Sequence, residues 1–260
     1  MFDPPDIAYL VCATPRSGST LLCEMLTDTG VAGRPGEPFE LLRGSNRPRQ
    51  PREYFEAVDD PAVLDLLPPL LPPAPAAGPF DERLRTVIRE GTTPNGVFGA
   101  KLMWGYQADL QARLAELPDL ERRSPAARLA AVFGDVRYIH VWRDDNVAQA
   151  VSLWRAVQTS AWRAEDDNGH EPRYSHAGID HFVRMLEAHR RAWAEWFDAE
   201  GITPLELRYE DVDADPSEAV RRTLEHIGIE PAGALPEPAL QRQSGPASHE
   251  WAERYRRECG

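Results

Sequence analysis

Short apolar runs alternate along the chain with longer segments in which apolar residues recur at helical spacing. The run from Ala8 to Ala13 is nearly all apolar, as expected for a parallel strand that is buried on both faces, and Ser19 to Asp28 follows with helical spacing. Val97 to Met103 predicts a second strand and Arg137 to Trp142 a third. A helix from about Asp145 to Ala161 follows the third strand at once.

The second half of the chain continues this alternation. Ile179 to Asp198 has helical spacing, Pro204 to Tyr209 predicts a fourth strand, and Pro216 to Ile227 predicts a helix that starts with proline. Gly33 to Pro51 and the Pro/Ala-rich stretch from Pro68 to Pro79 predict loops that cover a site. The alternation predicts an α/β fold, in which helices flank both faces of a central parallel sheet and ligands bind beyond the carboxyl ends of the strands.

Composition and charge narrow the class of protein. The chain has 260 residues, of which 42% are apolar, so we expect one domain over residues 1–260 with a substantial core. A net charge of −13 argues against a nucleic-acid surface, and local arginines must hold any anionic ligand. No apolar run approaches the roughly 20 residues that span a bilayer, and MFDPPD lacks the basic flank of a signal peptide, so we expect a cytoplasmic protein. The cysteines and histidines lack disulfide or metal spacing, and no metal is assigned.

The stretch YLVCATPRSGSTLLCEML, from Tyr9 to Leu26, combines a strand, a tight loop from Thr14 to Ser19 and the start of a helix. Such a turn points backbone N–H groups and a helix N-terminus at one spot, which favours phosphate or sulfate. Against the pattern G-x-x-x-x-G-K-[ST] the loop reads A-T-P-R-S-G-S-T, with Ser19 where the lysine would stand. Arg16 is therefore the candidate cation within the loop.

A second anion site is expected at the end of the third strand. Arg143 ends the segment RYIHVWR, and Ser152 lies on the helix that follows. A guanidinium fork and a hydroxyl can together bind a phosphate. Alternatively, Arg143 pairs with Asp144 or Asp145, and Ser152 faces solvent. Two phosphate sites together indicate a bisphosphorylated nucleotide.

Seven segments, in order and over most of the chain, resemble one group of enzymes. They are TPRSGSTLLCEML, TGVAGRPGEPFE, PREYF, FGAKLMWGY, HVWRDDNVAQAVSLWRAVQTSAW, RYEDVDADP and QRQSGPASHEWAERY. The chain resembles the sulfotransferases that use 3′-phosphoadenosine-5′-phosphosulfate (PAPS) and, in detail, the bacterial trehalose 2-sulfotransferase family. The resemblance implies a P-loop-like sulfotransferase fold and transfer of a sulfuryl group to a hydroxyl of a small-molecule acceptor.

The resemblance also assigns the donor site. The residues that would hold the 5′-phosphosulfate are Arg16, Ser17, Gly18, Ser19 and Thr20. Arg143 and Ser152 would hold the 3′-phosphate, and Arg242 in the QRQS segment would close over it, unless Arg242 is simply an exposed arginine on a C-terminal loop.

The general base of the family corresponds to Glu37 in GRPGEPFE, with Glu40 as the nearest competitor. A sugar hydroxyl is a poor nucleophile until a carboxylate takes its proton, so the chemistry requires such a group. Either carboxylate could instead be a solvated loop residue. Arg16 would stabilise the charge on the transferring sulfuryl group.

The acceptor region of the family corresponds to a loop and one aromatic residue. Its expected acceptor contacts are Arg34, Pro35, Gly36, Glu37, Pro38, Phe39, Glu40 and Tyr54. Gly36 and Pro38 stand where the family has larger polar or aromatic side chains, and Tyr54 stands where a tryptophan is expected. The acceptor thus stays open between trehalose and another glycosylated or hydroxylated metabolite. Lys101 could line this pocket or pair with a core carboxylate.

Two other functions stay open at this point. A P-loop kinase would share the sheet and the loop, although the loop lacks its lysine and no aspartate directly ends the third strand to bind Mg²⁺. A non-catalytic nucleotide-binding module is the other alternative. The family resemblance further implies a homodimer, with the Trp-bearing segment from Leu153 to Trp162 as the expected apolar surface.

Overall fold

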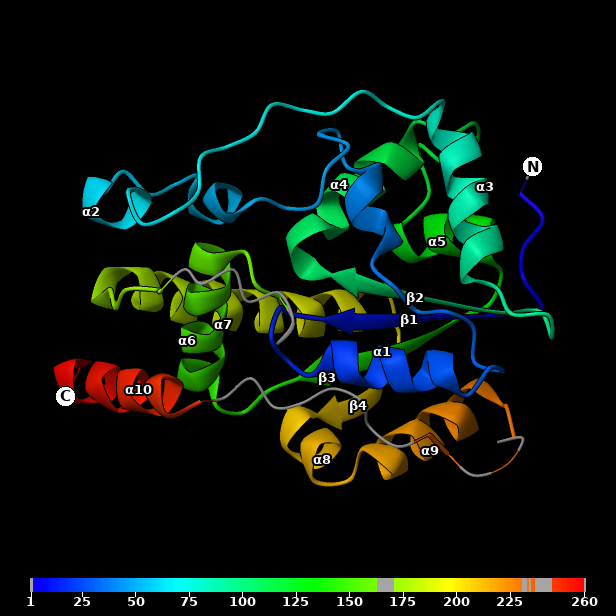
Figure 1. Cartoon of the computed structure of the whole chain (residues 1–260). Coiled ribbons are helices and arrows are strands. Elements are labelled where there is room, and N and C mark those ends of the chain that lie inside the picture. Colours follow the sequence, from blue (N-terminus) through cyan, green and yellow to red (C-terminus); the bar gives the residue numbers. More distant parts are fainter. Residues whose placement is uncertain (1, 163–170, 231–232, 234, 237–244, 260) are drawn as a thin grey trace.

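The computed structural model of the chain describes residues 2–162, 171–230, 233, 235–236 and 245–259. Its centre is a parallel sheet of four strands in the order β2-β1-β3-β4 (Figure 1). The strands are β1 (Ile7–Ala13), β2 (Val97–Met103), β3 (Val136–Trp142) and β4 (Leu205–Arg208). Val11 in β1 stands between Lys101 in β2 and Ile139 in β3, so β1 forms the middle of the sheet.

Helices cover both sides of this sheet. In Figure 1, α1 and α9 lie below the strands, and α3, α4 and α5 lie above them. The bounds of these helices are α1 (Ser19–Asp28), α3 (Phe80–Gly91), α4 (Trp104–Ala115), α5 (Pro125–Phe133) and α9 (Pro216–Ile227), and the short helix α8 (Tyr209–Ala214) follows β4 directly. The α/β fold with a central parallel sheet is therefore confirmed, whereas one domain over residues 1–260 stays a prediction.

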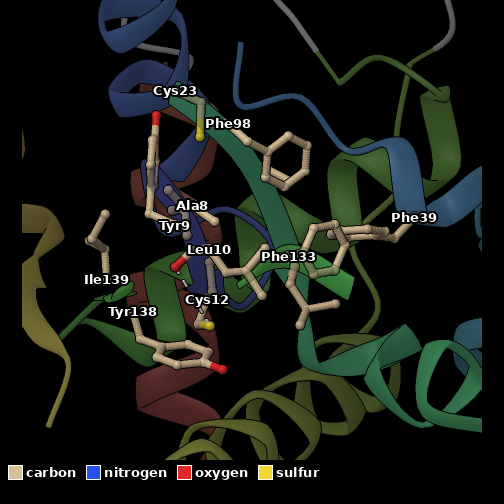
Figure 2. Packing of buried hydrophobic residues seen from close by; sticks show 14 of the residues in the cluster. Ala8, Tyr9, Leu10, Cys12, Cys23, Phe39, Phe98, Phe133, Tyr138 and Ile139 are labelled. Carbon is tan, nitrogen blue, oxygen red and sulfur yellow. Dashed lines mark hydrogen bonds between the residues drawn. The ribbon is translucent and has the colours of Figure 1, made fainter. Parts of the chain in front are cut away.

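The main core fills the space between the sheet and its helices. Phe98 of β2 stacks on Phe133 of α5 with ring centroids 5.1 Å apart, and Phe39 meets Phe133 edge-on at 6.0 Å (Figure 2). The hydroxyl of Tyr9 is buried and donates to the carbonyl oxygen of Ala32 at 2.6 Å. A paired hydroxyl of this kind removes the cost of burying the polar end of a tyrosine.

A second hydrophobic cluster lies beside the sheet. It joins α6 (Asn146–Thr159), α7 (His176–Ala199) and α10 (Pro246–Cys259) to two short elements, the 3-10 turn η2 (Pro51–Phe55) and α2 (Pro61–Leu64). Phe55 packs against Trp154 at 5.8 Å and Phe182 at 4.9 Å. The loop that carries Tyr54 is thereby fixed against α6 and α7.

This cluster corrects one expectation. The segment from Leu153 to Trp162 was expected to offer apolar surface to a second subunit. Leu153, Trp154 and Val157 are instead fully buried within the chain, because α7 and η2 cover this face of α6. Trp162 alone in this segment is an exposed large hydrophobic residue, at 37% exposure.

Among the described residues, no helix is long and apolar enough to cross a membrane.

Candidate active site

The loop between β1 and α1 forms one end of the site. Gly18 caps α1 in the left-handed region at φ 81°, and Arg16 takes a left-handed φ of 64°. No side chain caps the N-terminus of α1, and the first turn carries no acidic residue. The N–H groups at this terminus and its positive dipole therefore face the loop, as an anion requires.

Neighbouring elements hold this loop rigidly. Gln149 of α6 donates to the Thr14 hydroxyl at 2.9 Å and to the carbonyl oxygen of Pro15 at 2.7 Å. Tyr209 packs so closely on the other side that a Cβ on Gly18 would lie 2.6 Å from its Cδ2 atom. Both the positive φ and this close approach require glycine at position 18.

Two arginines meet beside the loop. Arg16 donates from Nε to the Ser152 hydroxyl at 2.9 Å and from Nη1 to the carbonyl oxygen of Trp162 at 2.9 Å. The Arg143 guanidinium lies over the Tyr209 ring at 4.3 Å, and its buried Nε has no hydrogen-bond partner. Burial, together with the like charge of Arg143, lowers the pKa of Arg16 to about 10. Such a pair of cations favours an anion between them.

The expected alternatives for this region do not match the contacts. Asp144 pairs with Arg208 at 3.1 Å, and Asp145 pairs with Arg256 of α10 at 2.7 Å. The Ser152 hydroxyl accepts from Arg16 and lines the same cavity as Arg143.

Glu37 lines the same cavity as these arginines and forms an ion pair with Lys101. The Glu37 carboxylate is 2.5 Å from the Lys101 ammonium, whose side chain is only 4% exposed. Lys101 also donates to the Thr20 hydroxyl at 2.9 Å, and the Tyr106 hydroxyl donates to Glu37 at 3.3 Å. Lys101 therefore pairs with a carboxylate and also contacts the anion loop, but it is not among the described residues that line the cavity.

Glu40 is a second carboxyl group in the cavity. Burial, and then the negative charge of Glu37, raises the pKa of Glu40 to about 7. Two carboxyl groups that differ in environment in this way can take different protonation states at neutral pH.

An aromatic and basic group of side chains, Arg49, Tyr54 and His189, also lines the cavity. Arg49 lies over the Tyr54 ring at 4.4 Å and is fixed by donation to the carbonyl oxygen of Gly105 at 2.7 Å. Burial, and then the charge of Arg49, lowers the pKa of His189 to about 4, so this imidazole is neutral at neutral pH. An aromatic face beside polar groups suits the apolar face and hydroxyls of a sugar ring.

These groups share one cavity of about 440 Å³. Of the residues predicted from the sequence, it is lined by Arg16, Gly18, Ser19, Thr20, Glu37, Glu40, Tyr54, Arg143 and Ser152. The cavity thus joins the anion loop, the second arginine and two carboxyl groups that the sequence places far apart.

The comparison with known families decides the class. The model of the Stf0 sulphotransferase family matches residues 8–258. The chain belongs to the Stf0 sulphotransferase family. The resemblance seen in the sequence is confirmed, and sulfuryl transfer is the activity of this enzyme class.

Two curated relatives of this Stf0 sulphotransferase match over nearly their whole length. The trehalose 2-sulfotransferase of Mycobacterium tuberculosis is 45% identical over 257 residues, which cover 96% of this chain and 95% of the relative. That of Mycolicibacterium smegmatis is 43% identical over 265 residues, which cover 100% and 97%. Among solved structures, the sulfotransferase domain from the curacin biosynthetic pathway has a TM-score of 0.48 at 14% identity, covering 95% of this chain and 83% of that one.

Several predicted acceptor contacts lie elsewhere in this Stf0 sulphotransferase. Phe39 is 1% exposed and packs in the core, because the turn η1 (Pro38–Leu42) directs its ring at Phe133. Arg34 is exposed and its side chain donates to the carbonyl oxygen of Glu90 at 3.4 Å. The backbone of Gly36 pairs with β2, and Pro35 is buried beside it. None of these four, nor Pro38, is among the described residues that line the cavity.

Two of the predicted donor residues, Ser17 and Arg242, are not among the described residues that line the cavity. Ser17 is fully buried within the loop, and its hydroxyl has no hydrogen-bond partner. Arg242 lies outside the described residues.

Sequence reasoning missed several residues that line the cavity. They are Pro15, Leu21, Pro48, Arg49, Met103, Gly105, Tyr106, Trp162, His189, Tyr209 and Asp213. Tyr209 follows the fourth strand directly, so its position at a strand end was the available signal. His189 lies in the middle of α7, and helical spacing alone does not show what this face meets.

Within the described part of the chain, no group of three or more His, Cys, Asp or Glu residues could hold a metal ion.

Proposed function

We propose that this enzyme transfers the sulfuryl group of PAPS to a hydroxyl of a small-molecule sugar acceptor. The observation that carries the proposal is one cavity that is lined by the anion loop, a second arginine, two carboxyl groups and an aromatic side chain. Membership of a sulphotransferase family favours this reaction over the kinase and over the non-catalytic module.

The residues present fit PAPS as donor. Arg16 and Arg143 bring two positive charges together beside the loop, and the buried Nε of Arg143 and hydroxyl of Ser17 lack partners. Gly18 leaves the loop open where a Cβ would strike Tyr209. When bound, PAPS supplies an activated sulfuryl group on a phosphate that leaves easily. Arg16 and the loop from Ser17 to Thr20 would hold the 5′-phosphosulfate, and Arg143 with Ser152 the 3′-phosphate.

Glu37 is proposed as the general base and Arg16 as the electrostatic stabiliser of the transferring group. Glu37 lines the same cavity as Arg16, so its carboxylate can take the proton of an acceptor hydroxyl that binds in this cavity. Its contacts with Lys101 and Tyr106 fix its orientation. Glu40 is the competing base, and its pKa of about 7 also suits proton transfer near neutral pH.

Trehalose is the first acceptor to test, because two relatives at 45% and 43% identity carry the name trehalose 2-sulfotransferase. Arg49, Tyr54 and His189 offer a stacked cation, an aromatic ring and a neutral imidazole at the acceptor end. These groups suit a sugar with several hydroxyls and do not by themselves choose which sugar.

The deciding experiment incubates the enzyme with PAPS and trehalose, and in parallel with a panel of glycosylated and hydroxylated metabolites. Mass spectrometry should show an acceptor that gains one sulfuryl group, with stoichiometric release of 3′-phosphoadenosine 5′-phosphate (PAP). Chelation of metals should leave the rate unchanged. Product formed with ATP and Mg²⁺ but not with PAPS would overturn the proposal in favour of a kinase.

A homodimer and a cytoplasmic location stay predictions. The dimer now rests on the family resemblance alone, since Leu153, Trp154 and Val157 are buried within the chain. Light scattering at micromolar concentration should give the mass of two chains, and a monomer would contradict this expectation.

A further inference from the structure

The anion loop lacks the lysine of the Walker pattern, yet an ammonium group reaches the loop from another strand. Lys101 is the only lysine in the whole chain, and it is buried in β2 beside Val11 of β1. Its Nζ atom lies 2.9 Å from the Thr20 hydroxyl, at the start of α1. The ammonium of lysine is more compact than the wide guanidinium of arginine and so suits this place better. Apart from the histidines, arginine supplies every other cationic side chain in the sequence.

The same ammonium pairs with the proposed base. Its Nζ atom lies 2.5 Å from a Glu37 oxygen, and the Tyr106 hydroxyl contacts the other oxygen at 3.3 Å. Among the described residues, Glu40, Cys23, Tyr54 and Tyr106 also interact electrostatically with this pair. Burial raises the pKa of Cys23 to about 12 and the pKa of both tyrosines above its ordinary value, so the thiol and the two hydroxyls are neutral. The charges of Lys101 and Glu37 therefore cancel beside the loop while Glu37 is ionised.

We propose that Lys101 couples proton arrival on Glu37 to the charge at the anion loop, which extends the function proposed above. As the acceptor oxygen forms its bond to sulfur, the hydroxyl proton passes to Glu37. The bond from sulfur to the phosphate oxygen breaks, with its electron pair left on that oxygen. Neutral Glu37 no longer cancels the charge of Lys101, so a full positive charge stands beside Thr20 when negative charge collects at the loop.

This coupling predicts opposite effects of two substitutions on the affinity for PAP, measured by calorimetry without turnover. Lys101→Met leaves the Glu37 carboxylate uncancelled beside the loop, and PAP should bind about tenfold more weakly. Glu37→Gln leaves the ammonium uncancelled, and PAP should bind several-fold more tightly, about threefold to tenfold. The double variant restores neutrality and should return to within about threefold of the wild type.

A second readout follows from the single lysine. Protein labelled with [ε-¹³C]lysine has one side-chain lysine signal, and this signal should move on Glu37→Gln and again when PAP is added. The signal reports the surroundings of Lys101 directly, so it remains usable if the Lys101→Met chain does not fold.

The outcomes separate the two proposals. If the wild type does not bind PAP at all, the proposed function fails. If the wild type binds PAP but Glu37→Gln binds it no more tightly, or the double variant remains as weak as Lys101→Met, the function stands and the coupling is overturned. A purely structural role of Lys101 predicts no gain in affinity from Glu37→Gln.

Discussion

Arg16 and Ser152 are 136 positions apart in the chain, and a hydrogen bond of 2.9 Å joins the Nε of the arginine to the hydroxyl of the serine. This contact ties the anion loop to α6 and brings Arg16 close enough to Arg143 for their charges to interact. Because both arginines are held in place before any ligand binds, binding an anion costs little side-chain conformational entropy.

The first prediction concerns the second phosphate. Arg143→Ala should lower the affinity for PAP by roughly 1.5–3 kcal/mol, the typical cost of a lost charge-assisted hydrogen bond, while AMP should lose much less. Calorimetry with both nucleotides measures the difference. Arg137→Ala removes an exposed arginine of β3, the strand that Arg143 follows, and serves as the control. Equal losses for PAP and AMP would contradict a 3′-phosphate site at Arg143.

The second prediction concerns Gly18. Gly18→Ala imposes a side chain at φ 81° and a contact of 2.6 Å with Tyr209, whose ring supports Arg143. We expect a loss of about 1–3 kcal/mol in stability and a clear loss of PAP affinity. Gly44→Ala is the matched control, because a Cβ there meets nothing within 4 Å. Urea unfolding and calorimetry check both effects, and a Gly18→Ala protein as stable as the control would refute the strain.

The sequence predicted the sheet well, because buried parallel strands are short apolar runs with clear ends. The segment Val97–Met103 was predicted with its bounds, and so were α1 and α9. Helix α4 was not predicted, because it starts at Trp104 directly after β2 and no side-chain cap marks its start. Helix α3 was not predicted either, although Phe80, Leu84 and Ile88 recur at helical spacing and are buried, so its amphipathic pattern was the available signal.

The site was predictable where a local motif carries it. The anion loop, Arg143 and Glu37 stand at strand ends or in a short loop, and all line the cavity. Arg49 and His189 reach it only because the second hydrophobic cluster packs η2 against α7, and no local pattern reports that packing. For the same reason, Phe39 was expected to contact the acceptor, whereas its ring is buried in the core.

The third prediction uses the raised pKa of Glu40. Its pKa rises from an ordinary value of 4.5 to about 7, so the folded protein holds more protons than the unfolded chain between these values. Stability from this group is therefore full below pH 4.5 and is lost as the pH rises through about 7. The shift corresponds to at most about 3–4 kcal/mol, since one pKa unit is about 1.4 kcal/mol.

Glu40→Gln keeps the shape of the side chain and removes this proton uptake. Between about pH 4 and about pH 8, the free energy of unfolding of the wild type should fall relative to that of the variant, so the higher pH favours the variant. Urea unfolding at both pH values measures it. A difference that is the same at both would show that Glu40 titrates normally.

The last prediction separates the two candidate bases. Glu37 lines the same cavity as Arg16, and its contacts with Lys101 and Tyr106 fix the orientation of its carboxylate. Burial, and then the charge of Glu37, raises the pKa of Glu40 to about 7, so this carboxyl group is partly protonated at neutral pH.

Glu37→Gln cannot accept a proton, so kcat should fall by roughly 10²–10⁴-fold. Glu40→Gln should lower kcat much less and act mainly on the KM for the acceptor, because it changes a wall of the acceptor end. Steady-state kinetics with the acceptor identified by mass spectrometry measure both variants, and a PAP affinity no weaker than that of the wild type shows that the donor site is intact. If Glu37→Gln kept full activity while Glu40→Gln lost it, Glu40 would be the base, and Lys101 would then orient a carboxylate that takes no proton.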